Sequence, residues 1–328
     1  MKKITILAIG FGLVVFSQKA GFSYFGTGIG ARALGMGGAF VAVGEGIDSC
    51  YWNPAGLGNI NESEVTIMRT MNNRDITNYQ EWLAAGTKLG DYGGLGVSYV
   101  RYKLGFLWRE KDTKKLTFCV GDDEWVGLAI GGYGKEQFKN VALGVNIRKR
   151  SSSLLRGTVT TNLRWSNCEP TGHTVDFIEY DVGVLYYVNK EFSIGLIIQN
   201  FNESTVNYGE DSPIYEFAWR KNIKPGIAWR PDEKTIFAID VYYFRLKDVY
   251  TTDIGEGQSE VRIGFERWCT DKIAIRAGLL SKYYHTIGFG LKGIELKKLF
   301  KDVKYDMDYA LLESYGEGTH FLSCTARF

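Results

Sequence analysis

Small residues at Gly28, Gly30 and Ala33 are the first feature of this sequence that could do chemistry. A GxGxxA pattern binds the pyrophosphate of a dinucleotide when it joins a strand to a helix in a βαβ unit. Here no strand pattern precedes the glycines and no βαβ unit follows, so a cofactor site is a weak interpretation. The physical alternative is a compact plug, because small residues let backbone segments pack closely. The pair Asn53 and Pro54 would then set a turn before the first strand.

Cysteine and histidine are too scattered to predict a metal centre or a disulfide framework. The five cysteines show no CxxC spacing and the three histidines lie far apart: Cys50, Cys119, Cys168, Cys269, Cys324, His173, His285 and His320. Ser-His-Asp groups assemble from distant residues, so a hydrolase stays open as a minor alternative, but no GxSxG motif supports it. We therefore predict a protein that is not an enzyme and holds no cofactor and no metal.

The one long apolar run lies at the start of the chain. A positively charged start (residues 1–3) precedes an apolar stretch (residues 4–16), and small or polar residues follow over 17–23. This pattern predicts a secretory signal peptide over residues 1–20, cleaved between 17 and 23, rather than a retained anchor or a buried strand. The chain has a formal net charge of +2, and the predicted cleavage removes three lysines and leaves it near neutral. Nothing in this balance indicates a nucleic-acid partner.

Composition and periodicity predict an all-β protein. The 328 residues include 40 Gly and only 5 Pro, and 14% are aromatic, which suits pleated sheets. Apolar and polar residues alternate with period two in many stretches, such as Val141–Arg148 and Lys272–Leu279. The mean hydropathy of −0.15 excludes a bundle of transmembrane helices.

Period two fits a soluble sandwich and also a membrane barrel, whose apolar face points outward to lipid. Stretches such as Tyr92–Tyr102 reach the roughly 9–11 residues that a tilted strand needs to cross a bilayer. Aromatic residues cluster at strand ends, and long connections alternate with short turns, as in outer-membrane barrels. We predict a barrel of about fourteen antiparallel transmembrane strands over residues 64–328: Glu64–Met71, Thr77–Lys88, Tyr92–Lys103, Asp122–Tyr133, Gln137–Lys149, Val175–Val188, Glu191–Phe201, Glu216–Trp229, Lys234–Arg245, Gln258–Trp268, Asp271–Leu280, Tyr283–Lys292, Val303–Leu312 and Thr319–Phe328.

Charged residues on these strands would face the lumen. The candidates are Asp240, Arg262, Glu266, Lys272, Arg276, Asp306 and Asp308. Paired charges inside a barrel usually hold the wall and a plug together. The functional alternative is a latch in which Arg32, before the first strand, pairs with a lumen carboxylate such as Asp308 and opens the path when the pair breaks.

The segment before the first strand carries the most distinctive text. Residues 31–43 read ARALGMGGAFVAV and residues 51–57 read YWNPAGL. These runs resemble the N-terminal signature of the FadL-like outer-membrane proteins, in particular their PorV/PorQ subfamily. Shorter runs agree: DVGVLY at 181–186, VRIGFERW at 261–268, IRAG at 275–278, MDYA at 307–310 and TH at 319–320. Arg267 and Phe321 depart from the family pattern, which bears on local contacts rather than on the fold.

The resemblance implies a fourteen-stranded barrel in the outer membrane, with residues 21–63 folded into its lumen as a hatch. The hatch residues that it marks are Arg32, Gly35, Gly37, Gly38 and the NPA motif Asn53, Pro54 and Ala55. Its partners would be outer-membrane lipid and the barrel-assembly machinery, which reads a terminal aromatic residue such as Phe328.

A hatch would exclude an open porin, so a substrate would pass a displaced hatch or leave sideways through the wall. Gly93, Gly94 and Gly96 in the third predicted strand mark a lateral opening, because missing side chains loosen a strand ladder. The alternative is that these glycines face a crowded hatch or sharpen the twist.

Two functions follow from the resemblance. One is a channel that binds or moves hydrophobic small molecules past the hatch, with apolar or aromatic residues converging behind it. The other is a PorV-like component of a type IX-like secretion system, with ordered outer loops that hold an exported protein and no connected internal pocket.

Overall fold

The computed structural model describes most of the chain from residue 28 onward. The described ranges are 28–72, 79–109, 116–135, 138–159, 165–166, 174–207, 216–219, 221–244, 258–281, 284–295, 303–314 and 317–328. The predicted signal peptide (1–20) and the first part of the predicted hatch (21–27) lie outside these residues.

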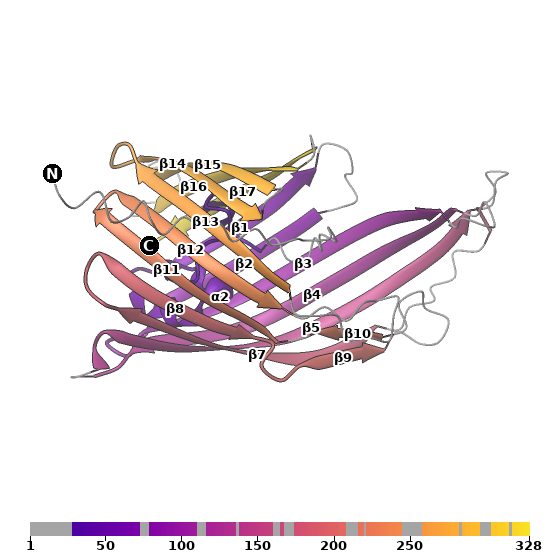
Figure 1. The fold of residues 1–328 in the computed structure, drawn as a ribbon, viewed down its shortest axis with the longest axis horizontal. Coiled ribbons are helices and arrows are strands. Elements are labelled where there is room, and N and C mark those ends of the chain that lie inside the picture. Colours follow the sequence, from indigo (N-terminus) through magenta and orange to yellow (C-terminus); the bar gives the residue numbers. More distant parts are fainter. Residues whose placement is uncertain are drawn as a thin grey trace.

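Fourteen strands close into an antiparallel barrel, and the two-residue β6 (Trp165–Ser166) adds to the same sheet. Figure 1 shows the arrangement of the strands. Each strand pairs with its neighbours along the chain, and β17 pairs with β1 to close the sheet. The predicted fold class is therefore confirmed. The barrel strands are β1 (Glu64–Asn72), β2 (Tyr79–Lys88), β3 (Gly94–Arg109), β4 (Leu116–Tyr133), β5 (Val141–Val159), β7 (Val175–Tyr187), β8 (Phe192–Gln199), β11 (Asn222–Asp232), β12 (Thr235–Phe244), β13 (Gln258–Trp268), β14 (Ile273–Ser281), β15 (Tyr284–Glu295), β16 (Lys304–Ser314) and β17 (Glu317–Arg327).

Several strands run past the ends that the sequence pattern predicts. Strands β3, β4 and β5 have 16, 18 and 19 residues and pair with one another well beyond the other strands. The predicted connections 104–121 and 150–174 are therefore partly strand, including the short β6 (Trp165–Ser166). The predicted strand 216–229 is divided, because β10 (Glu216–Trp219) pairs with β9 (Ser204–Asn207) in a separate small sheet. The sequence pattern does not reveal these extensions, because lipid imposes the apolar alternation only on the part of a strand that lies within the bilayer.

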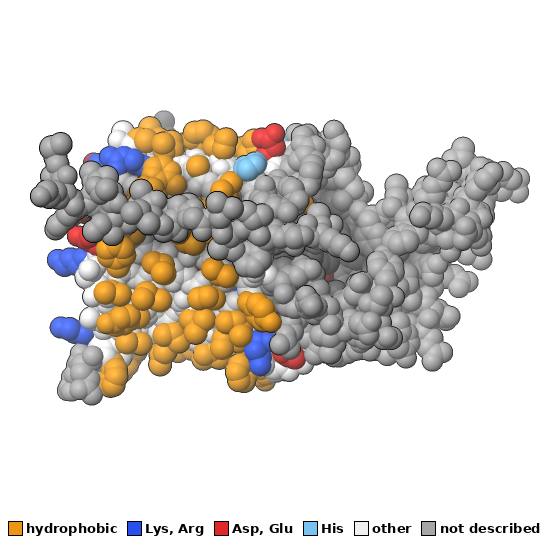
Figure 2. Space-filling model, viewed as in Figure 1, with side chains coloured by type: hydrophobic (Ala, Val, Ile, Leu, Met, Phe, Trp, Pro, Cys, Tyr) orange, Lys and Arg blue, Asp and Glu red, His pale blue; other side chains and the backbone are white. Residues whose placement is uncertain are grey.

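The wall turns its apolar side chains outward. On β4, Val126, Leu128 and Ile130 are 59%, 50% and 52% exposed, whereas the alternate residues Trp125 and Ala129 are buried. Figure 2 shows apolar side chains spread over the barrel wall, with charged side chains at its left edge. This is the inverse of a soluble sandwich and matches a lipid-facing surface. Within the described residues, no helix is long and apolar enough to cross a bilayer.

Residues 28–63, called here the inner segment, lie inside the barrel before the chain enters β1. The segment contains two short helices, α1 (Ala31–Gly35) and α2 (Ser49–Trp52), and a 3₁₀ helix, η2 (Pro54–Asn59). Most of its side chains from Ile29 to Leu57 are fully buried. The core of this protein is thus the packing of the inner segment against the inward face of the wall.

The chain enters β1 and leaves β17 at the same end of the barrel. There, the backbone groups of Ser63 and Phe328 exchange two hydrogen bonds of 3.1 Å. This end, called here the turn end, also carries the short connections 188–191, 233–234 and 269–272.

Candidate functional site

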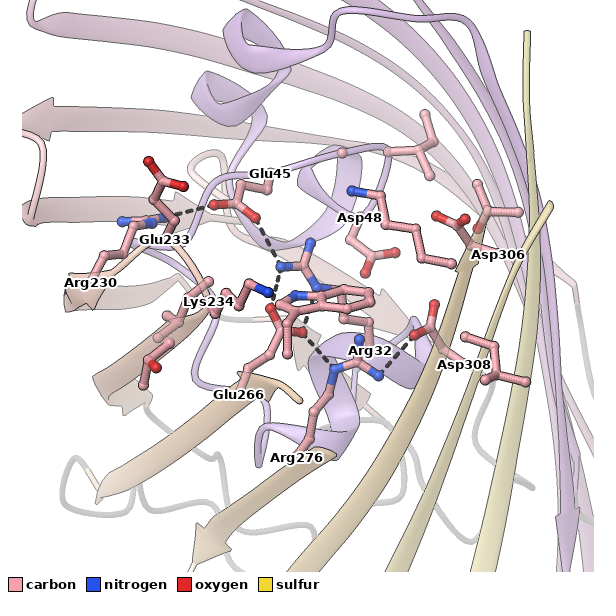
Figure 3. Close-up of a pocket in the computed structure, with 18 of the residues that line it drawn as sticks. Arg32, Glu45, Asp48, Arg230, Glu233, Lys234, Glu266, Arg276, Asp306 and Asp308 are labelled. Atoms are coloured by element: carbon pink, nitrogen blue, oxygen red, sulfur yellow. Dashed lines mark hydrogen bonds and ion pairs between the residues drawn. The ribbon is translucent and has the colours of Figure 1, made fainter. Parts of the chain in front are cut away.

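A chain of ion pairs crosses the mouth of the barrel at the turn end (Figure 3). Its centre is Arg32 on α1, whose guanidinium donates to both carboxylate oxygens of Glu266 on β13, at 2.7 and 2.9 Å. The same guanidinium donates to Glu45 of the inner segment at 2.9 Å. Two parallel bonds from one guanidinium to one carboxylate form the strong bidentate arrangement.

The wall extends this chain on both sides. On one side Arg276 of β14 donates to Glu266 at 2.6 Å and pairs with Asp308 of β16 at 2.8 Å. On the other side Arg230 of β11 pairs with Glu45 at 3.1 Å. This row of ion pairs is called here the latch chain. It consists, in order, of Arg230, Glu45, Arg32, Glu266, Arg276 and Asp308. Charges of opposite sign alternate along it, so each buried charge has a partner.

The contacts change the predicted latch in one respect. Arg32 binds Glu266 rather than Asp308, because Arg276 lies between them and takes the Asp308 carboxylate. Glu266 and Arg276 are fully buried, whereas Arg32 keeps 20% of its side chain exposed. Arg32 is therefore tied to the wall through one enclosed carboxylate, that of Glu266.

Electrostatics in the inner segment agree with these pairs. Burial by itself would raise the pKa of Glu45, but the guanidinium groups of Arg32 and Arg230 outweigh it and hold that pKa below its usual value. Burial would likewise lower the pKa of Arg32, and the carboxylates of Glu266 and Glu45 raise it well above its usual value instead. Both groups stay charged at neutral pH.

Asp48 differs from its neighbours in this mouth. Its carboxyl group makes no hydrogen bond or ion pair with the described residues. Burial raises its pKa to about 7; Asp308 and Glu64 add to the rise, and Arg32 and Arg276 oppose it. Asp48 is thus the group of the inner segment that changes charge near neutral pH.

The latch chain borders a cavity of about 600 Å³ that opens at the turn end. Its walls combine the inner segment with strand ends and turns, and most of the lining is charged or polar. The labelled residues in Figure 3 that line it include Asp48, Glu233, Lys234 and Asp306. Such a lining holds water and ions well and an apolar molecule poorly.

Side chains of the wall satisfy the backbone of the inner segment around most of the barrel. The carboxylate of Asp240 on β12 accepts the N–H groups of Phe40 and Val41 at 2.7 and 2.9 Å. Thr286 on β15 accepts from the N–H of Gly37 at 3.0 Å and donates to the carbonyl of Gly35 at 3.1 Å. These groups lie inside the barrel and would otherwise be unpaired, which makes each bond costly to lose.

Inward-facing glycines of the wall bring the backbone of the inner segment into direct contact with the strands. A methyl group at Gly144 of β5 would lie 2.2 Å from the backbone nitrogen of Ala55, and one at Gly131 of β4 would lie 1.9 Å from the carbonyl oxygen of Pro54. At Gly278 of β14 it would lie 2.2 Å from the backbone nitrogen of Gly37. Gly37 has φ +65°, a left-handed conformation that disfavours a side chain. The high glycine content therefore serves a close fit between wall and inner segment.

The NPA motif joins two parts of the inner segment to the wall. The amide of Asn53, fully buried, donates to the carbonyl of Val41 at 2.9 Å and to the carbonyl of Val184 on β7 at 3.0 Å. Its oxygen accepts the N–H of Ala55 at 3.2 Å and caps η2, which begins at Pro54. A predicted turn thus also anchors the inner segment.

Farther from the turn end, the inner segment meets a layer of aromatic rings and cations. Tyr51 stacks on Trp125 of β4 with ring centroids 6.3 Å apart. Across the lumen, Tyr242 of β12 donates to the carbonyl of Gly38 at 2.9 Å. Over the ring of Tyr242 lie Lys224, with Nζ 4.2 Å from the centroid, and Arg262, with Cζ 3.8 Å from it. Aromatic faces and cations at this spacing attract one another.

A second cluster of charges lines the wall beside this layer. Arg148 and Arg150 of β5 pair with Asp123, Glu179 and Asp181, at distances from 2.7 to 3.3 Å. All five side chains are at most 7% exposed. Alternating charges on neighbouring strands again compensate one another, so this cluster stabilises the wall.

The predicted lumen charges divide into groups. Glu266, Arg276 and Asp308 belong to the latch chain, and Asp240 binds the inner segment directly. Arg262 stacks on Tyr242 and pairs with Glu260, whereas Asp306 lies in the mouth and pairs with Arg327. Lys272 is a correction: it is exposed in the turn before β14, because that strand begins at Ile273, two residues later than the predicted start at Asp271.

The glycines of the predicted lateral opening pack against the inner segment. A methyl group at Gly94 would lie 2.3 Å from the carbonyl oxygen of Leu57, and one at Gly96 would lie 2.2 Å from Sγ of Cys50. The ladder is continuous through both, since β3 pairs with β2 on one side and β4 on the other. Gly93, at φ +131°, lies in the preceding turn against the carbonyl of Gly131. The crowded-hatch alternative fits these contacts, and an opening here would need a change of conformation.

Other predicted residues have simpler places. Gly35 packs on Gly288 of β15, where a methyl group would lie 3.1 Å from the Cα, and Gly38 lies against Arg262. Phe328 is 61% exposed beyond the end of β17.

Sequence reasoning missed Glu45, Asp48, Arg230, Tyr242 and Lys224. Glu45 lies between Gly44 and Gly46, and both glycines have positive φ. A charged residue framed by two glycines inside a run of small residues was the available signal. Asp48 lies in the inner segment just before α2, and Arg230, Tyr242 and Lys224 lie on strands with ordinary alternation, where nothing in the sequence marks them. In the described part of the chain, no group of His, Cys, Asp and Glu side chains is arranged to hold a metal ion.

No protein-family model and no curated protein sequence matches this chain. Solved structures do. The toluene transporter TodX of Pseudomonas putida matches 92% of this chain and 96% of its own length, with a TM-score of 0.59 at 11% identity. CymD, described as a monoaromatic hydrocarbon channel, matches 92% of this chain and 97% of its own, with a TM-score of 0.58 at 10% identity. A FadL homologue of Pseudomonas aeruginosa covers 89% and 96%, with a TM-score of 0.56 at 10% identity.

This chain has the fold of the FadL-type channels. The low identity limits the likeness to the fold, and the predicted PorV/PorQ subfamily stays a prediction.

Proposed function

We propose that this protein is an outer-membrane channel for small hydrophobic molecules and that the inner segment acts as its hatch. The observation that carries the proposal is the shared fold, which extends over 92% of the chain to TodX and CymD, proteins described as a toluene transporter and a monoaromatic hydrocarbon channel. The outward apolar face supports the membrane location.

The packing of the inner segment supports a closed barrel rather than an open porin. Wall glycines contact its backbone directly, and wall side chains bind its carbonyl and N–H groups. Free passage of water and sugars past such contacts would require the segment to move. A solute therefore needs an affinity for the protein that drives a local rearrangement.

The aromatic layer is the proposed contact for the solute. Tyr51, Trp125 and Tyr242 are buried in this state, where they stack on one another or lie under cations, so a small apolar or aromatic molecule arriving from the end opposite the mouth would contact them once the inner segment shifts. The neighbouring cations would also tolerate an amphipathic molecule with a polar end. This is the arrangement expected of the channel alternative, with aromatic residues converging behind the hatch.

The exit we propose is lateral, between β2 and β3. The mouth at the turn end is charged and holds an apolar molecule poorly. By contrast, the side chains packed on the glycines of β2 and β3 are apolar: Ile47 on Gly86, Cys50 on Gly96, and Ile60 on Gly94. An apolar path from the lumen to lipid therefore passes between β2 and β3, with Gly93, Gly94 and Gly96 as its hinge residues.

A disulfide between β2 and β3 tests the exit. Ala85 and Val97 are paired on β2 and β3, so Ala85→Cys/Val97→Cys would fasten the two strands. A matched control fastens β13 and β14 through Ile263→Cys/Leu279→Cys, another directly paired couple. We expect uptake of labelled toluene by cells carrying the first variant to fall when the disulfide forms and to recover on reduction. Equal uptake in the oxidised and reduced states would contradict a lateral exit, and the control should transport in both.

The latch chain would hold the hatch at rest. Arg32 is the only described residue of the inner segment that pairs with Glu266, so its substitution frees α1 at one point without touching the strand ladder. The PorV-like alternative, a component that binds an exported protein, stays a prediction, and no observation on the described residues favours it.

A further inference from the structure

Two parts of the inner segment, residues 28–43 and 53–60, follow the wall in the order in which the strands neighbour one another. The first part begins at β2 and β1, where Gln80 donates to the carbonyl of Gly28 and the N–H of Gly30 donates to Met68. It continues to β17, where the N–H of Ala31 donates to Ser323 at 2.9 Å. The segment therefore starts at the seam between β1 and β17.

The next residues pass along the C-terminal strands in descending order. Gly35 and Gly37 bind Thr286 of β15, and Gly37 then lies against Gly278 of β14. Met36 and Ala39 lie against Gly264 of β13. Further contacts join Val41 to Asp240 of β12, Val43 to Arg230 of β11, and Ala42 to Ser193 of β8.

The second part completes the circuit in the same direction. Asn53 binds β7 through the carbonyl of Val184, and Pro54 and Ala55 lie against Gly144 of β5 and Gly131 of β4. The circuit ends with Leu57 against Gly94 of β3 and Ile60 against Gly86 of β2, just before the chain enters β1. Residues 28–43 and 53–60 together thus make one turn around the inner wall in the order of the strands. Residues 44–52, between these two parts, cross the lumen and contact β2 and β3 through Ile47 and Cys50.

We propose that the inner segment has a second role as the template on which the barrel closes. The seam joins β1 to β17, which are separated by most of the chain, so their pairing carries a large loop-closure cost and is intrinsically slow. The inner segment is covalently joined to β1 and holds β15 and β17 through Thr286 and Ser323. Binding these strands first raises the effective concentration of β17 at β1.

The spiral geometry supports this order of events. The backbone of the segment lies directly against wall glycines around the circle, which leaves no space between segment and wall. The segment therefore cannot be threaded into a closed barrel unless the wall opens. Curling the sheet around the segment forms the same contacts one strand at a time. The Ser63 and Phe328 backbone bonds beside the seam then complete closure.

Folding kinetics of the full chain test the template. The double variant Thr286→Val/Ser323→Ala removes the three hydrogen bonds that tie Gly35, Gly37 and Ala31 to β15 and β17, with little change of volume. The matched control is Ile287→Ala/Leu322→Ala, which alters the adjacent residues of the same strands on the lipid side, where they are 52% and 41% exposed. Closure from urea into lipid vesicles is followed by the resistance of the closed barrel to SDS without heating.

We expect the inward double variant to close about tenfold more slowly, which corresponds to ~1.4 kcal/mol in the barrier. The outward control should change the closure rate by less than about twofold, because its contacts form with lipid after insertion. If the inward variant closes at the parental rate and only unfolds faster, the segment docks after closure and the template is overturned.

The single variants Thr286→Val and Ser323→Ala provide the same readout with a smaller loss, should the double variant fail to fold. Each should slow closure by a part of the effect of the double variant. The result does not depend on what the channel carries.

Discussion

Arg32→Met would loosen the inner segment at one point, and its effect can be worked out from the latch chain. Breaking a buried ion pair costs about 3–5 kcal/mol when the remaining charge is left alone. Here Glu266 keeps Arg276 at 2.6 Å, Glu45 keeps Arg230 at 3.1 Å, and Arg32 itself is 20% exposed. We therefore expect a loss of about 2–3 kcal/mol in the local stability of α1.

Hydrogen exchange measures this loss at named amides. The N–H of Leu34 donates to the carbonyl of Gly30 at 2.9 Å within α1, so it exchanges only when that turn opens. A loss of 2–3 kcal/mol should speed its exchange by about 30- to 150-fold. Arg230→Met is the matched control: it removes the pair with Glu45 and the hydrogen bonds to Val43 and Ser193, none of which involves a residue of α1, so it should speed exchange at Leu34 about fivefold at most.

If exchange at Leu34 is unchanged in Arg32→Met while amides of β14 exchange faster, the ion pairs stabilise the wall and do not restrain the hatch. The role of the latch chain would then be structural.

Two further predictions concern the fit and the charge of the inner segment. Because burial raises the pKa of Asp48 to about 7, the unfolded chain ionises this carboxyl at lower pH than the folded chain, and stability falls as pH rises from about 4 to 7. Asp48→Asn should therefore unfold in urea with about 1–2 kcal/mol more stability than the parent at pH 8 and with no gain at pH 4; an equal difference at both pH values would contradict a neutral Asp48. Gly144→Ala places a methyl group 2.2 Å from the backbone of Ala55 and should cost about 2–3 kcal/mol in the same assay. Gly318→Ala, whose methyl group would meet side-chain atoms alone, Leu311 at 3.2 Å and His320 at 3.8 Å, should cost less than about 1 kcal/mol, and equal losses would argue against a close fit at Gly144.

The sequence predicts the wall well because lipid forces a simple rule on it. Outward positions such as Leu143, Val145 and Ile147 must be apolar, so the strands that cross the bilayer can be recognised from the alternation of apolar and polar residues. Beyond the bilayer this rule lapses, and the extensions of β3, β4 and β5 were predicted as connections. Lys272 was misplaced for a related reason: alternation gives the side of a strand but not the residue at which the strand begins.

The site was predicted only in outline. Arg32 was identified as a residue that ties the hatch to the wall, but its partner depends on where α1 lies around the circle of strands. Sequence spacing carries no such angle, so Glu266 and Asp308 could not be distinguished. Glu45 belongs to the inner segment itself and completes the latch chain only through the fold of a loop with two positive-φ glycines.

The most direct test of the central claim is the uptake of labelled toluene by cells whose outer membrane carries this protein in place of their own channels, measured beside a small sugar. A hatch-closed hydrophobic channel should speed toluene uptake over cells without the protein and leave sugar uptake unchanged. Unchanged toluene uptake, or entry of the sugar at a porin-like rate, would contradict the account.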